Sequence, residues 1–283
     1  MLNNPEIKTK YLGYGLLPLP PDNLDFKYEK VFGAVQVPET DFTISEPLYI
    51  EDQKGSDYCG AYASSSGAED HEGIDLDPIF SFAAIKKIDG KPEGWGANLR
   101  DIMKAGTKIG FLEKTDAIFT VDDDREKIVH ITNYPTELID KALKHRQESY
   151  FSISSGFEGF RQALWQNRAR KRSIITGVSW RGGWSEAPNG IIPVEATEQY
   201  FGHAIKIYGQ KNIDGKLYLV AQLSNGKGIG EGGIFYFPKE VIDRDFNFGA
   251  YCYVDMGQEE AQKKSWSWWD IIVNFIKKLW QKN

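Results

Sequence analysis

The stretch QKGSDYCGAY, residues 53–62, constrains this chain most, because it places a cysteine where a loop turns into a helix. Glycines and small polar residues precede Cys59, and a run of small residues follows it as far as Ala68. The pattern predicts a buried helix that begins at Cys59 and ends at Gly73, since glycine favours the left-handed turn that closes a helix. The positive end of a helix dipole stabilises a thiolate. Cys59 is therefore a candidate nucleophile.

A cysteine nucleophile needs a base and groups that stabilise the oxyanion. Among the four histidines, His71 lies too far along the same predicted helix to reach the sulfur. His130 and His145 lie in polar sequence and are expected to be exposed. His203 follows Gly202 and opens an alternating stretch, so its ring can project from the end of a strand. We therefore expect His203 to be the base.

The alternative for Cys59 is a packed thiol, which is what a lone cysteine most often is. The chain has only two cysteines, too few for a disulfide scaffold, and this indicates a reducing compartment. Cys252 lies in the alternating stretch FGAYCYV and is expected to be in the core. Gln53 stands six residues before Cys59 (59 − 53) and, together with His203, favours the nucleophile.

Composition and charge exclude several classes of function. The formal net charge is −6, whereas a nucleic-acid-binding protein would present a basic face. The first residues, MLNNPEIKTKY, lack the apolar core of a signal peptide, and no segment is apolar and long enough to span a bilayer. No group of residues has metal-site spacing. The stretch GIGEGG, residues 228–233, precedes a β-rich segment rather than a helix, so we expect no nucleotide and no cofactor.

The chain divides into three parts. Residues 1–50 are proline-rich and predict an extended arm laid across a body, with a brief strand at 31–35. Residues 51–257 form the main domain. Residues 258–283 predict a polar linker and an amphipathic helix with a tryptophan-rich face. That helix could dock on the body, on another protein or, least favoured because of the acidic body, on a membrane.

Helices precede strands within the main domain, which is an α+β pattern. Helical periodicity and start or stop signals predict helices at 59–73, 78–88, 98–105, 135–146 and 157–172. Alternating, β-branched stretches predict strands at 173–180, 203–209, 217–223, 233–237 and 248–254. Two tryptophans after the first strand, Trp180 and Trp184, either line a cleft or cover the sheet.

Four motifs in one order resemble the papain-like (C1 family) cysteine peptidases over roughly residues 50–255. They are Gln53 before Cys59, the stretch GHAI at 202–205, the stretch YLVAQLSNG at 218–226, and GIGEGG. His203 lies 144 residues after Cys59 (203 − 59), within the spacing of about 130 to 150 found in that family.

The resemblance implies a papain-like α+β fold, with a helical half that carries Cys59, a β-rich half that carries His203 and a cleft between them. It implies a thiol endopeptidase that acts on a peptide or protein, with Gln53 as the oxyanion donor. Further residues expected to bind substrate are Gly94, Trp95, Gly96 and Gly202.

The chain also departs from the family pattern. Gly60 replaces the usual tryptophan after the nucleophile, and Leu223 falls where the family has the asparagine that orients the histidine. A leucine cannot accept the imidazole N–H. Either Asn225 reaches in from two residues later, or a backbone carbonyl or water holds the ring, or the site is impaired.

Two further functions stay open, the first of them because of these departures. One is a catalytically impaired papain-like module that binds or builds a phage-like assembly, and the other is an isopeptidase or cell-wall amidase. The arm is too short and too rich in proline for the helical propeptide of secreted relatives. It resembles the short leader of bacterial and viral relatives, which implies a cytoplasmic or virion-associated protein without a secreted zymogen cycle.

Overall fold

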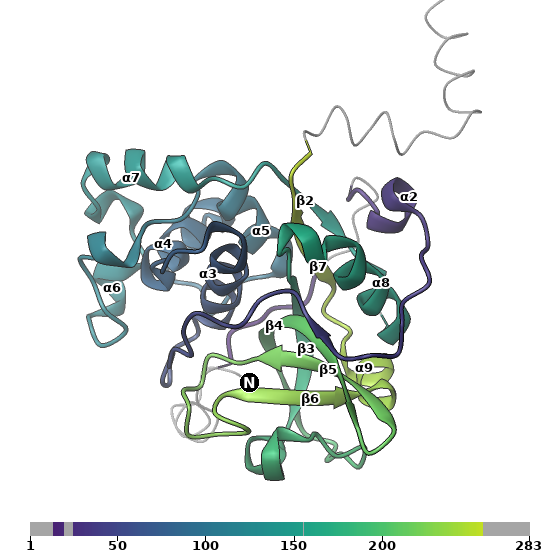
Figure 1. Cartoon of the computed structure of the whole chain (residues 1–283). Coiled ribbons are helices and arrows are strands. Elements are labelled where there is room, and N and C mark those ends of the chain that lie inside the picture. The colour runs from purple at the N-terminus through teal and green to yellow at the C-terminus, as the bar shows by residue number, and fades with distance from the viewer. Residues whose placement is uncertain (1–13, 20–24, 155, 257–283) are drawn as a thin grey trace, which may run out of the picture.

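The computed structural model of the 283-residue chain describes residues 14–19, 25–154 and 156–256 (Figure 1). The predicted C-terminal helix lies outside the described residues, so its three possible docking sites stay open. Within the described residues, no helix combines the length and the apolar character that a membrane crossing requires.

The helical half is built around three helices, α3 (Cys59–Glu72), α4 (Pro78–Asp89) and α5 (Leu99–Lys108). The short helices α6 (Arg125–Ile128) and α7 (Thr136–Ala142) lie on its outer side (Figure 1). Local sequence sets the helix ends. The Asp77 side chain accepts the Ile79 N–H at 3.0 Å to cap α4, and Gly73 takes the left-handed conformation after α3.

The other half is a sheet in which every described strand pair is antiparallel. The strand order is β2-β7-β3-β4-β5-β6, and β1 pairs separately with β4. The strands are β1 (Phe42–Thr43), β2 (Ser149–Ser152), β3 (Ile174–Arg181), β4 (Tyr200–Ile213), β5 (Lys216–Gln222), β6 (Ile234–Pro238) and β7 (Ala250–Val254). Helices α2 (Tyr28–Phe32), α8 (Phe157–Asn167) and α9 (Lys239–Asp245) lie beside the sheet (Figure 1).

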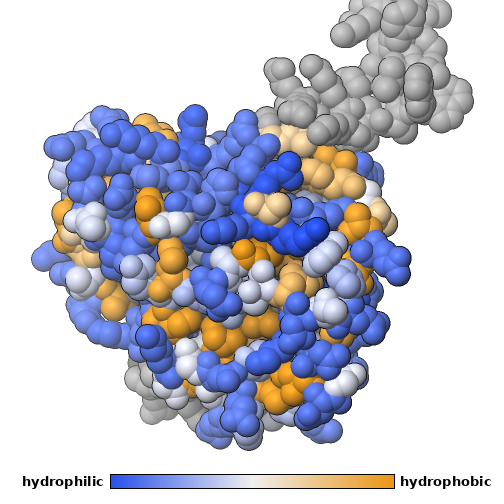
Figure 2. Space-filling view, viewed as in Figure 1, coloured by the Kyte–Doolittle hydropathy of each residue, from blue (hydrophilic) through white to orange (hydrophobic). Residues whose placement is uncertain are grey.

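Short 3₁₀ turns connect these elements, at Lys114–Asp116, Ile131–Asn133, Leu143–His145, Arg168–Arg170, Trp184–Glu186 and Pro188–Gly190. On the face viewed in Figure 1, hydrophilic side chains dominate over the helical half, whereas apolar ones gather mainly over the sheet half (Figure 2).

Buried apolar side chains form two clusters, one in each half. The helical cluster includes Cys59 and extends to the sheet residues Ile175, Ala204 and Tyr251. The sheet cluster lies on the other side of the strands and includes Trp180, Trp184 and Cys252. The N-terminus of α3 therefore meets β4 where the two cores adjoin. Trp180 and Trp184 are both buried, so they belong to the core of the sheet half.

The predicted α+β architecture is confirmed, and each predicted helix and strand of the main domain has a counterpart. The end of α5 was predicted wrongly, because the helix continues through Gly106 to Lys108. A Cβ at Gly106 would lie 2.3 Å from the Tyr253 hydroxyl oxygen, so this glycine permits close packing instead of ending the helix.

Elements with little apolar periodicity were missed. Four of them, β2, α2, α6 and α9, are short and depend on tertiary contacts. The brief strand expected at 31–35 is wrong, because Tyr28–Phe32 form α2. The rings of Tyr28 and Phe32 stack with centroids 4.5 Å apart, which is the spacing of helical neighbours at i and i+4.

The described residues before α3 make several contacts with the sheet half. β1 pairs with Gln210 and Gly209 of β4, and the Arg161 guanidinium of α8 donates to the Pro38 carbonyl at 3.1 Å. These contacts hold the arm along the sheet half.

A buried ion pair joins α3 to β4. Lys206 Nζ lies 2.9 Å from Asp70 Oδ1, and each side chain is 1% exposed. Lys206 also donates to the Ser66 carbonyl of α3 at 3.3 Å. Removing one member of such a pair leaves a buried charge without its counter-ion, which costs more than the intact pair contributes.

We expect Asp70→Asn to lower the free energy of unfolding by about 3 kcal/mol, because it leaves the buried Lys206 ammonium without its counter-ion. Urea unfolding followed by circular dichroism measures the change. As a control, Lys216→Met breaks the exposed Lys216–Glu240 pair, which should change stability by less than about 1 kcal/mol. A double variant, Asp70→Leu with Lys206→Met, should be more stable than Asp70→Asn. Equal losses of unfolding free energy in Asp70→Asn and Lys216→Met would contradict this account.

Candidate active site

Cys59 is the first residue of α3 and is fully buried. Small residues let this helix pack closely on its neighbours. A Cβ at Gly60 would lie 2.3 Å from Ile102 Cδ1 of α5, and one at Gly67 would lie 2.5 Å from Ile175 Cδ1 of β3. Gly60, where the resembled family has tryptophan, is therefore required by the packing of α3 on α5.

His203 lies on β4, opposite Val178 of β3, and is 1% exposed. Its ring meets Trp180 edge-on, with centroids 5.8 Å apart. The next residue, Ala204, makes a backbone hydrogen bond to the Cys59 thiol. The fold therefore brings the predicted nucleophile and the strand position of the predicted base to one place.

The other three histidines lie elsewhere. His71 Nδ1 is 2.9 Å from the Arg170 carbonyl oxygen, at the far end of α3. His145 lies between Glu72 and Glu113, with ring nitrogens 3.5 and 3.3 Å from their carboxylates. His145 is therefore only partly exposed, contrary to the sequence-based expectation.

Gln53 is fully buried in the loop that precedes Cys59. Both the nitrogen and the oxygen of its side-chain amide have hydrogen-bond partners. Its Nε2 donates to the Ser56 carbonyl at 2.9 Å, and its Oε1 accepts the Ser224 hydroxyl. Its backbone N–H also donates to the Ser224 carbonyl at 2.7 Å. Ser224 thus orients Gln53, a role for which the sequence carried no signal.

Leu223 and Asn225, the two residues that the sequence relates to the orientation of the His203 ring, follow β5. Leu223 is buried and, with Ala204, lines a small pocket between α3 and the sheet. Asn225 is partly buried and forms an isolated antiparallel bridge with Asp52. Which group orients the His203 ring stays a prediction.

Residues 14–17 of the arm, here called the arm segment, lie against the predicted substrate-binding loop of the helical half. The Ala97 N–H donates to the Gly15 carbonyl, and the Leu17 N–H donates to the Ala97 carbonyl, both at 2.9 Å. The Trp95 indole donates to the Tyr14 carbonyl at 2.7 Å. The strand-like pairing is parallel.

The arm segment also contacts the sheet half. The Leu16 N–H donates to the Gly202 carbonyl at 3.2 Å. A Cβ on Gly202 would lie 2.3 Å from the Leu16 carbonyl oxygen, and one on Gly177 would lie 2.1 Å from Leu16 Cδ2. The Leu16 side chain is buried beside Gly177 and Phe248. The arm segment therefore bridges the two halves.

Glycines on both partners make this close approach possible. A Cβ at Gly15 would lie 2.0 Å from the Asp57 carbonyl oxygen, and one at Gly96 would lie 1.8 Å from the Gly15 carbonyl oxygen. Gly96 also has a φ of +62°, which disfavours other residues. Three of the predicted substrate-binding residues, Trp95, Gly96 and Gly202, thus contact the arm segment.

The arm segment covers the Cys59 sulfur. Burial raises the pKa of the Cys59 thiol to about 11, although backbone hydrogen bonds from Ala204 and Gly15 oppose the shift. Burial likewise raises the pKa of Tyr14 to about 12, and the Tyr14 ring meets His203 edge-on at 5.5 Å. The Cys59 thiol is therefore protonated at neutral pH while the arm segment is in place.

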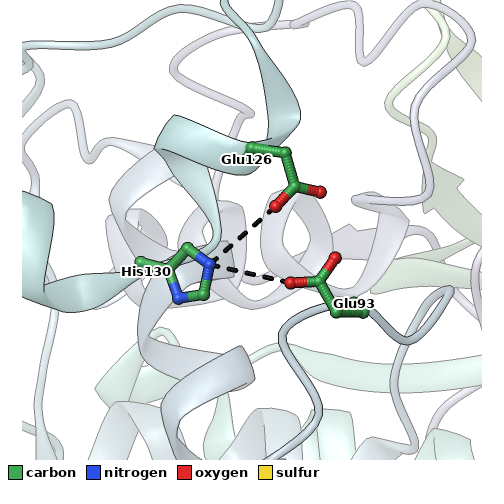
Figure 3. A group of neighbouring side chains, drawn as sticks. All are labelled: Glu93, Glu126 and His130. Carbon is green, nitrogen blue, oxygen red and sulfur yellow. Dashed lines mark ion pairs between the residues drawn. The ribbon is translucent and has the colours of Figure 1, made fainter.

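One group of possible metal ligands, Glu93, Glu126 and His130, occurs among the described residues (Figure 3). His130 Nε2 lies 3.8 Å from Glu93 Oε1 and 4.0 Å from Glu126 Oε2. Both carboxylates are largely exposed, and His130 is 39% exposed. The imidazole and the two carboxylates thus lie at ion-pairing distance on the surface of the protein.

No family model and no curated protein matches the chain. Solved structures do match. Xylellain, a cysteine protease from Xylella fastidiosa, has a TM-score of 0.69 and 19% identity, over 87% of this chain and 97% of the other. Procathepsin L2 from Tenebrio molitor larval midgut has a TM-score of 0.64 and 16% identity, over 89% and 80%. Procathepsin B S9 from Trypanosoma congolense has a TM-score of 0.63 and 13% identity, over 88% of each.

We expect Gly15→Val to expose the Cys59 thiol, because its side chain cannot fit against the Asp57 carbonyl and must displace the arm segment. If the thiol pKa falls toward its ordinary value of about 8.5, alkylation by iodoacetamide at pH 7 should accelerate on the order of a hundredfold. Mass spectrometry of the Cys59 peptide measures the rate.

The matched control is Gly228→Ala, since a Cβ at Gly228 meets nothing within 4 Å. In that variant and in the unmodified chain, the rate should be slow at pH 7 and rise with pH up to about 11. Rapid alkylation of the unmodified chain at pH 7 would show that the arm segment does not protect the sulfur.

Proposed function

Because the chain has the papain-like fold, we propose that it is a thiol endopeptidase whose arm segment keeps it latent. The observation that carries the proposal is the arm segment itself. An extended stretch of polypeptide crosses Cys59 and makes backbone hydrogen bonds to Ala97 on one side and Gly202 on the other. A groove that holds an extended backbone in this way suits a peptide or protein substrate.

The proposed chemistry begins when the arm segment leaves and water reaches the sulfur. Cys59 then transfers its proton to His203 and forms a thiolate–imidazolium pair, aided by the N-terminus of α3. The thiolate attacks a substrate carbonyl carbon. The side-chain amide of Gln53 and the backbone N–H of Cys59 donate to the oxyanion.

Collapse of the tetrahedral intermediate breaks the peptide C–N bond and leaves a thioester on Cys59. The His203 imidazolium protonates the departing amine and so becomes neutral. It then takes a proton from water, whose hydroxide attacks the thioester and releases the acid. One N–H of Gln53 Nε2 donates to the Ser56 carbonyl in the latent state, and the amide nitrogen carries a second N–H.

Two features support latency. The arm segment excludes substrate, and its burial of the thiol keeps the nucleophile protonated, so it suppresses both binding and chemistry. Two of the structural neighbours are named as procathepsins, which supports a pro-segment role for the arm. The sequence, from the length and proline content of the arm, predicted no secreted zymogen cycle, whereas this proposal gives the arm a pro-segment role.

The second candidate is a catalytically impaired papain-like module that binds a partner or contributes to an assembly. Leu223 favours it, because a buried leucine stands where the resembled family has its orienting asparagine. Loss of an orienting residue alone lowers turnover less than loss of nucleophile or base, so we rank the endopeptidase first.

We expect the Gly15→Val variant to cleave fluorogenic peptides that carry an apolar residue near the cleaved bond. The reason is that Leu16 of the arm segment packs in an apolar site beside Phe248. In that background, Cys59→Ala and His203→Ala should abolish turnover, and Gln53→Ala should lower kcat roughly 10²- to 10³-fold. Initial rates of fluorescence increase measure each.

Gly228→Ala alone should remain as inactive as the unmodified chain. If Gly15→Val reacts with the epoxide inhibitor E-64 but cleaves no peptide, the impaired-module candidate replaces the endopeptidase. If it neither reacts nor cleaves, the peptidase proposal fails.

A further inference from the structure

A buried carboxylate lies immediately before the nucleophile. Asp57 stands two residues before Cys59 in the sequence, and its side chain is 1% exposed. Its Oδ2 accepts the backbone N–H of Gly96 at 2.5 Å. Gly96 directly precedes Ala97, which pairs with the arm segment. Asp57 therefore connects the start of α3 to the strand-like stretch that binds the peptide backbone.

A single guanidinium completes this connection. Arg125 of α6 lies 3.2 Å from Asp57 Oδ2, and it donates to the carbonyls of Pro92 at 3.0 Å and Gly94 at 2.8 Å. Its guanidinium also lies over the Phe82 ring, 5.7 Å from the centroid. Arg125 thus bonds both the carboxylate before Cys59 and two carbonyls of the loop that leads to Gly96.

We propose that Arg125, acting through Asp57 and the 92–94 carbonyls, is a positioning residue that fixes the peptide-pairing stretch at Gly96 relative to Cys59. It determines how firmly the site holds any extended peptide, including the chain's own arm segment. Where it concerns peptide substrates, the inference rests on the proposed endopeptidase function. Where it concerns binding of the arm segment, it is independent of that function.

The geometry requires arginine in particular. The acceptors on three residues surround one planar group, which matches the several fixed N–H directions of a guanidinium. Lysine could neutralise Asp57 but could not reach both loop carbonyls at once. Arg125 is itself 26% exposed at its side chain and covers the ring of Phe82, a member of the helical cluster, so the stability of each Arg125 variant must be measured beside its alkylation rate.

Cys59 alkylation in the full chain tests the inference without any need for peptidase activity. Arg125→Ala should loosen the loop, release the arm segment more often and raise the iodoacetamide rate at Cys59 about tenfold, since several charge-assisted hydrogen bonds are lost. Arg125→Lys should lie between Arg125→Ala and the unmodified chain.

The matched control is Arg181→Ala, which removes one of the two described arginine partners of another buried carboxylate, Asp245, between β3 and α9, where Arg244 remains. Its alkylation rate should equal that of the unmodified chain. Thermal unfolding by circular dichroism accompanies each variant, and if Arg125→Ala does not fold, Arg125→Lys carries the test.

A second measurement separates positioning from general loosening. With the arm segment displaced by Gly15→Val, adding Arg125→Ala should leave the iodoacetamide rate within about twofold, because that small reagent needs no backbone pairing. KM for a peptide substrate should rise about tenfold while kcat changes little.

The inference is overturned if Cys59 of the Arg125→Ala variant is alkylated at the same rate as in the unmodified chain. It is also overturned if Arg181→Ala accelerates alkylation as much as Arg125→Ala does. It is also overturned if kcat falls with KM unchanged. If Gly15→Val cleaves no peptide at all, the proposed function fails, whereas the alkylation rates of the full-chain variants still decide the role of Arg125.

Discussion

The packing of α3 against β4 is the contact on which the site depends. Gly60 and Gly67 let the helix approach α5 and β3 to distances that any larger residue would forbid. The buried Lys206–Asp70 pair joins the same two elements farther along the helix. This contact brings Cys59 to the strand position of His203, and neither half alone would hold both.

The arm segment contacts Cys59 directly. The Gly15 backbone hydrogen-bonds the Cys59 thiol, and burial raises the pKa of that thiol to about 11. In this arrangement the sulfur is therefore both covered and held at a raised pKa. Because the segment is held mainly through backbone groups of Ala97 and Gly202, the interactions that protect the sulfur are of the kind that would bind a peptide.

Much of the fold could be predicted because its long elements carry a clear period or boundary signal. The small-residue run after Cys59 and the Gly73 stop predicted α3 almost to the residue, and Pro78 marked the start of α4. The elements α2, β2, α6 and α9 were missed because they span few residues and are stabilised by contacts distant in sequence. Gly106 was misinterpreted as a stop because the sequence does not show that Tyr253 packs against it.

The candidate site divides in the same way. The sequence by itself determined which residues are candidates for the chemistry, since the spacing of Gln53, Cys59 and His203 follows from local motifs along one chain. Only the tertiary structure decided what surrounds them, because the contacts join segments that no local pattern links. Ser224 orients Gln53, Arg125 connects Asp57 to the loop that leads to Gly96, and the Gly15 backbone hydrogen-bonds the Cys59 thiol. The stretch around Cys59 therefore predicts a reactive cysteine, whereas the folded chain buries that cysteine and so raises the pKa of its thiol.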